Sequence, residues 1–131
     1  MREAAQLLGV SDDTLRRWVE AGRVAVQQDA GGRQVVEGAA LAALAEELAA
    51  SAERPQPRPV VSESARNRFV GLVTRVVRDT VMAQVDIQAG PHRVVSLMSR
   101  EAADDLGLEP GVLAIAAVKS TNVVVEVPEQ P

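Results

Sequence analysis

Prolines at every second position of residues 54–59 constrain this chain more than any other feature of its sequence. Proline cannot continue a helix or donate to a β-ladder, and it disfavours helix in the residue before it. The surrounding stretch also lacks hydrophobic periodicity. The sequence therefore predicts an extended, semi-rigid linker over residues 54–63, which separates a domain at residues 1–53 from a second domain at residues 64–131.

Composition limits how each domain can be stabilised. Hydrophobic residues make up 47% of the 131 residues, but aromatic residues make up only 2%, so the cores must consist of Ala, Val and Leu. Cores of small side chains bury little area per residue. Burial between subunits is therefore expected to supplement folding.

The sequence also indicates a compartment. The chain has no cysteine, which excludes disulfides, a thiolate nucleophile and sulfur-ligated metal sites. It has no signal-like opening segment and no run approaching the ~20 apolar residues that cross a bilayer. We therefore expect a cytoplasmic protein that does not bind membranes.

The first domain shows the pattern of a winged helix-turn-helix. Apolar residues recur at helical spacing in the first eight positions, and Gly9 ends that helix. Ser11 is a good N-cap for a second helix over residues 12–21. A two-stranded hairpin is predicted over residues 24–36, and a third helix around residues 41–48.

Charge restricts how this domain could contact DNA. The chain carries 14 basic and 18 acidic residues, for a net charge of -4, and residues 1–53 carry five arginines against nine acidic residues. Such a balance argues against a basic field that attracts nucleic acid. Any DNA contact must come from a few well-placed arginines, since an arginine fork can read guanine edges in the major groove.

The first domain resembles the DNA-binding domain of the MerR and excisionase superfamily. The residues that carry the resemblance are Glu3-Ala4-Ala5, Leu8-Gly9-Val10-Ser11, Thr14-Leu15-Arg16-Arg17-Trp18, Gly22-Arg23 and Gly32-Arg33. In that family the hairpin is a wing on the phosphate backbone, which implies phosphate contacts for Arg23 and Arg33. The predicted DNA-binding residues are Thr14, Arg16, Arg17, Arg23 and Arg33. Small helical domains of this kind also serve as protein-binding modules, and Trp18 is expected in the core.

The second domain has the pattern of an all-β barrel. β-branched or alternating runs occur at residues 70–73, 81–87, 94–98, 112–118 and 123–127. Only residues 99–106 interrupt them, with a helical turn or two that Ser99 opens and Gly107 closes. The predicted fold class is α+β, in which a small winged helix-turn-helix is followed by a five-stranded OB-like barrel.

Hydrogen-bond donors collect at the predicted strand ends of this barrel. Arg66 precedes the first strand, Lys119 and Ser120 end the fourth, and Ser99 lies at a helix N-terminus, where backbone N–H groups favour anions. A tetrahedral dianion without a proton needs a site made of donors only. Either charge taken singly is more often an ordinary surface residue, but the ordered set indicates an oxyanion site.

The second domain resembles the Mop domain of molbindins and ModE regulators, from Ser64 to about Val127. The carriers are Ser64-Ala65-Arg66-Asn67, Leu106-Gly107-Leu108-Glu109-Pro110-Gly111 and Lys119-Ser120-Thr121-Asn122-Val123. The resemblance implies molybdate or tungstate as ligand, no organic cofactor, and sites shared between barrels, hence a homo-oligomer from dimer to hexamer. Where ModE has a second hydroxyl, this chain has Ala102. The oxyanion-binding residues implied are Ser64, the Ala65 backbone, Arg66, Asn67, Ser99, Lys119 and Ser120.

These observations favour a regulator over an enzyme. The sequence contains no paired carboxylates, no Ser-His-Asp set and no glycine-rich phosphate loop. The leading hypothesis is a transcriptional regulator that senses molybdate or tungstate and binds an operator of molybdate uptake or molybdenum cofactor genes. The alternative is an intracellular molybdate buffer whose helical domain binds protein rather than DNA.

Overall fold

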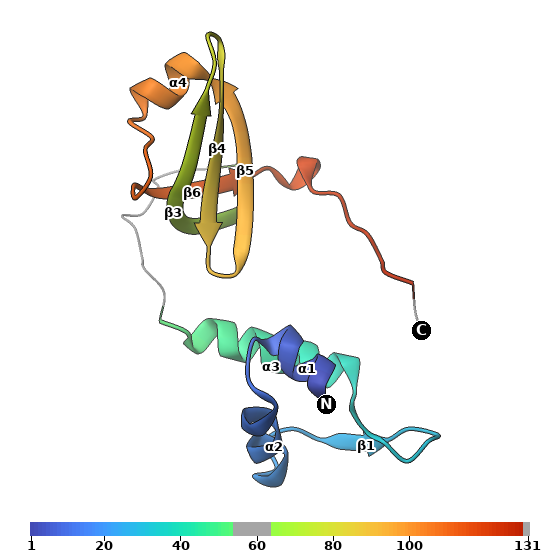
Figure 1. Ribbon diagram of the computed structural model, residues 1–131. Coiled ribbons are helices and arrows are strands. Elements are labelled where there is room, and N and C mark those ends of the chain that lie inside the picture. Colours follow the sequence, from blue (N-terminus) through green and yellow to red (C-terminus); the bar gives the residue numbers. More distant parts are fainter. Residues whose placement is uncertain (54–63, 130–131) are drawn as a thin grey trace. The chain divides into compact units, whose positions relative to one another are not determined.

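The computed structural model describes residues 1–53 and 64–129, and Figure 1 shows their course. The chain forms two compact units, Met1–Arg54 and Pro55–Pro131, here called the N-terminal and the C-terminal unit. The linker predicted at residues 54–63 lies outside the described residues. Within the described part, no helix combines the length and the apolar character needed to span a bilayer.

The N-terminal unit has the predicted order of helix, helix, hairpin and helix. Its first turn is fixed locally: Gly9 ends the first helix with a left-handed φ of 70°, and the Ser11 Oγ caps the second by accepting from the Thr14 backbone N at 3.1 Å. The prediction of a small winged helix-turn-helix is therefore confirmed. The elements are α1 (Arg2–Leu8), α2 (Asp12–Glu20), β1 (Val26–Gln28), β2 (Gln34–Val36) and α3 (Gly38–Ser51).

One small core holds the N-terminal unit together. Leu15 from α2 is fully buried, and Trp18 and Val19 from the same face pack against that core, as the sequence predicts. The apolar stripe of α2 thus faces inward, and its polar positions are left outside. The buried residues of this core are Ala4, Ala5, Leu15, Val24 and Leu44.

The C-terminal unit is one curved antiparallel sheet with a short helix. The strands follow the order β5-β4-β3-β6, so β5 and β6 form its two edges. β6 is reached from β5 through α4, which lies at one end of the sheet (Figure 1). The elements are β3 (Asn67–Arg78), β4 (Met82–Ala89), β5 (His92–Ser99), α4 (Arg100–Asp105), β6 (Leu113–Val118) and the 3-10 turn η1 (Ser120–Asn122).

The long strand β3 gives the sheet its curvature. Its first half pairs with β6, and its second half pairs with β4. The register with β4 shifts between Val73 and Arg75, and an irregularity of this kind bends a strand and increases its twist. Gly71 pairs with Ala114 of β6, one residue before the pairing with β4 begins at Leu72. A side chain at Gly71 would meet the backbone of Gln88, so the strands can approach closely there. β3 therefore wraps the sheet around its core.

The predicted fifth strand is not part of this sheet. Residues 123–127 follow η1 as an extended, exposed segment, and they pair with no strand among the described residues. Figure 1 shows this segment leading away from the sheet. Strand propensity at these valines is high, but a strand also needs an edge to pair with. The sequence therefore predicts four strands correctly, while the count of five is not confirmed in a single chain.

Candidate oxyanion and DNA-binding sites

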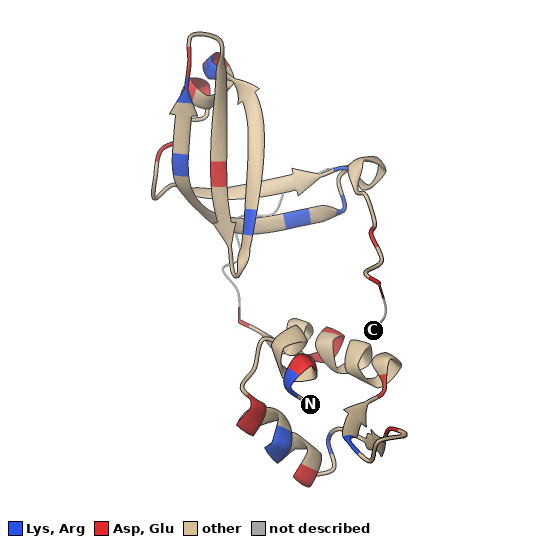
Figure 2. Ribbon diagram, turned by 45° about the vertical axis from the view of Figure 1, so that its right-hand side comes forward, with Lys and Arg blue, Asp and Glu red and all other residues tan. Residues whose placement is uncertain are grey.

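The pairing of β3 with β6 brings two distant parts of the sequence to one end of the sheet. Asn67, the first residue of β3, is in register with Val118, the last residue of β6. The Asn67 side-chain amide also donates to the Val118 carbonyl at 3.2 Å. The residues that flank this pair, Arg66 and Lys119, therefore leave the sheet at the same end, where Figure 2 shows basic positions gathered.

The side chains at this end form a donor-rich surface. Lys119 is the sole lysine of the chain. Arg66, Lys119 and Ser120 are exposed, and neither Arg66 nor Lys119 has an ion-pair partner among the described residues. Two cationic groups with a nearby hydroxyl can attract and orient a dianion. We call residues 64–67 with Lys119 and Ser120 the β3–β6 donor cluster.

Asn67 differs from the other members of this cluster. Its amide nitrogen is engaged with Val118, and the residue is half-buried. The oxygen that remains is an acceptor, which an anion without protons cannot use. In the structure Asn67 joins β3 to β6. A direct contact between Asn67 and the anion stays a prediction.

Ser99 lies elsewhere in the sheet. It is in register with Met82, next to the Arg78 end of β3, whereas the donor cluster is at the Asn67 end. β3 has 12 residues, so at about 3.3 Å per residue the two ends are up to roughly 35 Å apart. One copy of the chain therefore does not bring Ser99 beside Lys119.

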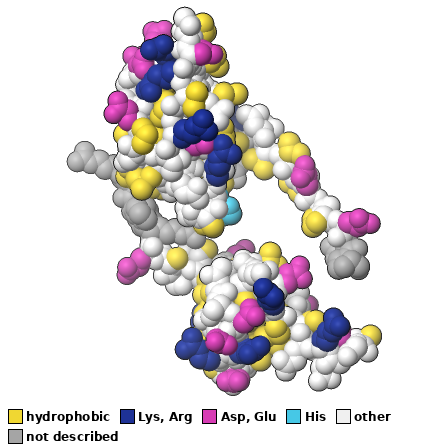
Figure 3. Space-filling view, viewed as in Figure 1, with side chains coloured by type: hydrophobic (Ala, Val, Ile, Leu, Met, Phe, Trp, Pro, Cys, Tyr) yellow, Lys and Arg dark blue, Asp and Glu magenta, His cyan; other side chains and the backbone are white. Residues whose placement is uncertain are grey.

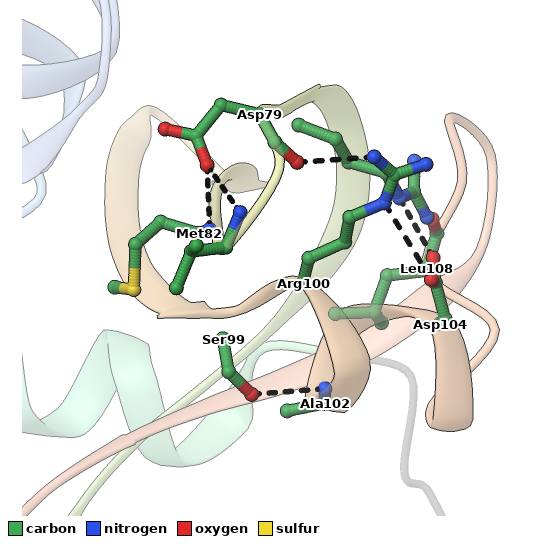
Figure 4. A network of polar contacts seen from close by, with 9 residues as sticks. Asp79, Met82, Ser99, Arg100, Ala102, Asp104 and Leu108 are labelled. Atoms are coloured by element: carbon green, nitrogen blue, oxygen red, sulfur yellow. Dashed lines mark hydrogen bonds and ion pairs between the residues drawn. The ribbon is translucent and has the colours of Figure 1, made fainter.

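The surroundings of Ser99 are specialised for capping α4 (Figure 4). The Ser99 Oγ accepts from the Ala102 backbone N at 3.0 Å, and the Arg100 backbone N donates to the Val81 carbonyl at 2.8 Å. Two of the N–H groups that the sequence offered to an anion are thus already bonded. The shallow hollow beside Ser99 is lined by one cation, Arg100, and by three acidic residues, Glu101, Asp104 and Asp105, so its net negative charge disfavours a dianion. What Ser99 can still offer an anion is its hydroxyl proton.

The polar network that holds α4 against the sheet was missed by the sequence reasoning. Arg78 donates to Asp104 and to the Leu108 carbonyl, both at 2.9 Å, and Arg100 donates to the Asp79 carbonyl at 3.1 Å (Figure 4). The Asp79 carboxylate accepts from two backbone N–H groups of the β3–β4 turn, which lowers its pKa below the usual range. This network fixes the β3–β4 turn and holds α4 against the sheet.

A second unpredicted feature is an ion pair on the outer face of the sheet. Asp86 of β4 is buried although it faces away from the core, because Arg93 of β5 covers it. Arg93 donates to the Asp86 carboxylate at 2.7 Å and 3.0 Å, and Gln84 donates to it at 3.2 Å. The Arg93 hydrogen bonds, followed by that from Gln84, hold the pKa of Asp86 low.

The outer face of α2 presents the predicted base-reading residues. Arg16 and Arg17 are exposed, while Thr14 is half-buried. Arg16 lies 3.8 Å from Asp13, and Arg17 donates to the Thr14 hydroxyl at 3.3 Å. The Thr14 hydroxyl also bonds to Ser11 at 2.9 Å, so it belongs to the cap of α2. Both arginines remain at the surface, where they can reach DNA.

The two arginines that are expected to contact DNA phosphates, Arg23 and Arg33, have different surroundings. Arg23 stacks on the Trp18 ring at 4.7 Å and pairs with Glu47 of α3 at 3.1 Å, so it also ties the turn after α2 to α3. Arg33 is exposed in the wing, whose turn Asp29 stabilises by accepting from the Arg33 backbone N at 3.0 Å. In Figure 3 basic and acidic side chains alternate on the visible face of this unit, which fits placed contacts rather than a basic field.

Comparisons with known proteins agree with this division of the chain. The model of the TOBE domain matches residues 63–125, and the model of a helix-turn-helix domain matches residues 1–49. Molybdenum-pterin-binding protein 3 of Clostridium pasteurianum is 38% identical over 66 residues, which are 50% of this chain and 97% of that protein.

Two further proteins match the same half of the chain. Molybdenum transport protein ModE of Herbaspirillum seropedicae is 38% identical over 68 residues, which are 51% of this chain and 25% of that protein. The solved structure of the cytoplasmic molybdate-binding protein ModG with molybdate bound has 35% identity and a TM-score of 0.50, and the match covers 51% of this chain and 48% of that one. All three similarities concern about half of this chain.

Proposed function

Because the chain belongs to the TOBE domain family and carries a helix-turn-helix domain in the same polypeptide, we propose that it is a DNA-binding regulator that responds to molybdate or tungstate. The observation that carries the proposal is the β3–β6 donor cluster. It joins two cationic side chains and hydroxyl groups at one end of the sheet. A tetrahedral dianion is the ligand that such a set of donors recognises.

The relatives support molybdenum oxyanions as the ligand class. One is named a molybdenum-pterin-binding protein, and ModG is a cytoplasmic protein with molybdate bound in its structure. We therefore propose the same ligand class and the same compartment here, with no organic cofactor and no catalytic role. The match to ModE, named a molybdenum transport protein, supports the link to molybdenum, and the helix-turn-helix unit supports regulation. The operator would then belong to genes of molybdate uptake or molybdenum cofactor synthesis.

The DNA-binding role is assigned to one face of the N-terminal unit. Arg16 and Arg17 on α2 would read base edges, and Arg33 on the wing would contact a phosphate. Since acidic residues outnumber arginines in residues 1–53, affinity depends on these placed side chains. The same excess of acidic residues favours the second candidate function, a molybdate buffer whose N-terminal unit binds protein.

Isothermal titration calorimetry on the full chain tests the ligand. Lys119→Met should abolish the heat of molybdate binding, because the variant keeps the length of the side chain and removes its charge. Lys119→Arg should retain binding in part, since it preserves a cationic donor. Arg2→Ala, a charge removed from α1, is the matched control and should bind as the wild type does. No binding by the wild type would end the proposal.

Fluorescence anisotropy with the DNA upstream of the chain's own gene separates the two candidate functions. A regulator forms a sequence-specific complex whose affinity changes when molybdate is added, whereas a buffer forms none. Arg17→Ala should weaken the complex without altering the calorimetric signal for molybdate. Lys119→Met should keep DNA affinity and lose the response to molybdate; a full response in that variant would refute the assigned site.

A further inference from the structure

We propose that Glu47 sets the affinity of the N-terminal unit for DNA, because it occupies the Arg23 guanidinium until a DNA phosphate takes its place. The inference rests on the proposed function, since it concerns how the same unit binds DNA. Three observations carry it: the ion pair between the two side chains, the fixed position of Arg23, and the small number of basic residues in residues 1–53.

Arg23 is held in place between α2 and the wing. Its backbone N donates to the Trp18 carbonyl at 2.9 Å, and its guanidinium lies 4.7 Å from the centre of the Trp18 ring. The chain then enters the wing, where β1 begins at Val26. Arg23 therefore lies between the two elements that the proposed function places on DNA, and its contacts with Trp18 keep it there.

Glu47 of α3 neutralises Arg23. The Arg23 guanidinium donates to a carboxylate oxygen of Glu47 at 3.1 Å, and 38% of the Arg23 side chain and 65% of the Glu47 side chain are exposed. A guanidinium binds carboxylates and phosphates through the same planar set of N–H donors. Glu47 thus occupies a cation that a phosphate could bind. Because ion pairs this exposed are weak, a phosphate can displace Glu47.

The neutralisation of one arginine matters in this unit because it has few of them. Residues 1–53 carry five arginines against nine acidic residues. Contacts between cations and phosphates supply the part of DNA affinity that does not depend on sequence, so each neutralised arginine lowers that part. A complex that uses Arg23 must first break its pair with Glu47. Glu47 therefore lowers the affinity for DNA and makes binding depend more on the base contacts of α2.

Fluorescence anisotropy of the full chain with the DNA upstream of its own gene tests this exchange. Glu47→Gln keeps the shape of the side chain and removes its charge, and should tighten binding by about three- to fivefold. The slope of log K against log salt should become steeper by about 0.9, the contribution of one phosphate contact. The matched control Glu46→Gln changes the adjacent residue of α3, which makes no ion pair within the described residues, and should tighten binding by less than about twofold.

A double variant shows whether Glu47 acts through Arg23. In the Arg23→Ala background, Glu47→Gln should change the affinity no more than Glu46→Gln does, because the group that Glu47 occupies is gone. A folding defect cannot imitate the expected result, since a misfolded variant would bind DNA less tightly.

Three results would overturn the inference and leave the proposed function intact: weaker binding by Glu47→Gln, equal effects of the two glutamine variants, or an undiminished effect of Glu47→Gln without Arg23. If neither the wild type nor any variant binds DNA, the proposed function fails together with the inference.

Discussion

Gly71→Ala should destabilise the C-terminal unit selectively. Gly71 lies inside β3 and pairs with Ala114 of β6, one residue before the pairing with β4 begins. The added Cβ would approach the Gln88 carbonyl carbon at 2.8 Å and the Ala89 Cα at 3.0 Å. These neighbours are backbone atoms, so the strands themselves must separate. Overpacking of this kind costs about 1–3 kcal/mol. In a domain of this size each kcal/mol lowers Tm by about 4–8 °C, which predicts a loss of roughly 5–20 °C.

Two optical signals can assign this loss to one unit. Trp18 is the sole tryptophan of the chain and packs in the N-terminal unit, so its fluorescence reports unfolding of that unit alone. Far-UV circular dichroism reports both units. Gly71→Ala should lower the Tm of the β-sheet signal and leave the fluorescence transition unchanged, at equal protein concentration.

A matched glycine provides the control for this experiment. A Cβ added at Gly38, at the start of α3, would meet no neighbouring atom within 4 Å, and Gly38 has no positive φ. Gly38→Ala should therefore be neutral or stabilise the N-terminal unit by up to ~1 kcal/mol. If Gly71→Ala left the circular-dichroism transition within 1 °C of the wild type, the close approach of β3 and β4 at Gly71 would be refuted.

Three further predictions follow from side-chain contacts. Arg93 lowers the pKa of Asp86 below its ordinary 3.8, so the pair contributes its full stability above pH 3.8 and loses it as the pH falls through the pKa in the folded state. Asp86→Asn should therefore be less stable than the wild type at pH 7, and its free energy of unfolding, measured by urea titration, should fall less steeply at acidic pH. Ser11→Ala removes the cap of α2 and should cost the N-terminal unit about 1 kcal/mol in Trp18 fluorescence melts, whereas Ser11→Asp should restore most of it. Arg23→Ala removes the contact with the Trp18 indole and the ion pair with Glu47, and should lower the stability of the N-terminal unit by about 1 kcal/mol in the same melts. An unchanged Tm would show that these two contacts of Arg23 do not stabilise the unit.

The sequence was most informative where structure depends on neighbouring residues. Gly9 and Ser11 mark the turn between α1 and α2 because a left-handed residue and a capping hydroxyl act over three or four positions. The hydrophobic spacing of Leu15, Trp18 and Val19 likewise fixes which face of α2 is buried. Each of these signals is local, so each could be recognised without knowledge of the fold.

The length and the pairing of the strands could not be predicted fully from the sequence, because strands pair with residues that are distant along the chain. The pattern predicted a strand at residues 70–73, but β3 runs from Asn67 to Arg78. The prediction was too short because polar residues such as Arg75 lie on the solvent face of β3 and interrupt the run of hydrophobic residues. The run at residues 123–127 shows the opposite case. Its composition is that of a strand, but composition cannot identify the edge, or the copy of the chain, with which a strand pairs.

The candidate anion site shows the same limit. That residues 64–67 and 119–120 meet could be anticipated, because strand ends gather in a barrel, and the pair Asn67–Val118 brings them together. The position of Ser99 could not be anticipated from the sequence, because it depends on the register of β5 with β4 and on the placement of α4. The donor roles of these residues, and the DNA contacts of α2 and the wing, remain predictions.

If one anion contacts both Ser99 and Lys119, anion binding and association of the chain are expected to depend on each other. The two residues lie at opposite ends of one sheet, so an anion that contacts both must take them from two copies. A ligand that binds only the associated form stabilises that form, and its apparent affinity rises with protein concentration. Molybdate titrations at protein concentrations well below and well above the dissociation constant of the expected homo-oligomer should therefore differ in apparent affinity. Ser99→Ala should weaken binding at both concentrations. An affinity independent of concentration, with Ser99→Ala unchanged, would mean that the β3–β6 donor cluster of one copy holds the anion without Ser99.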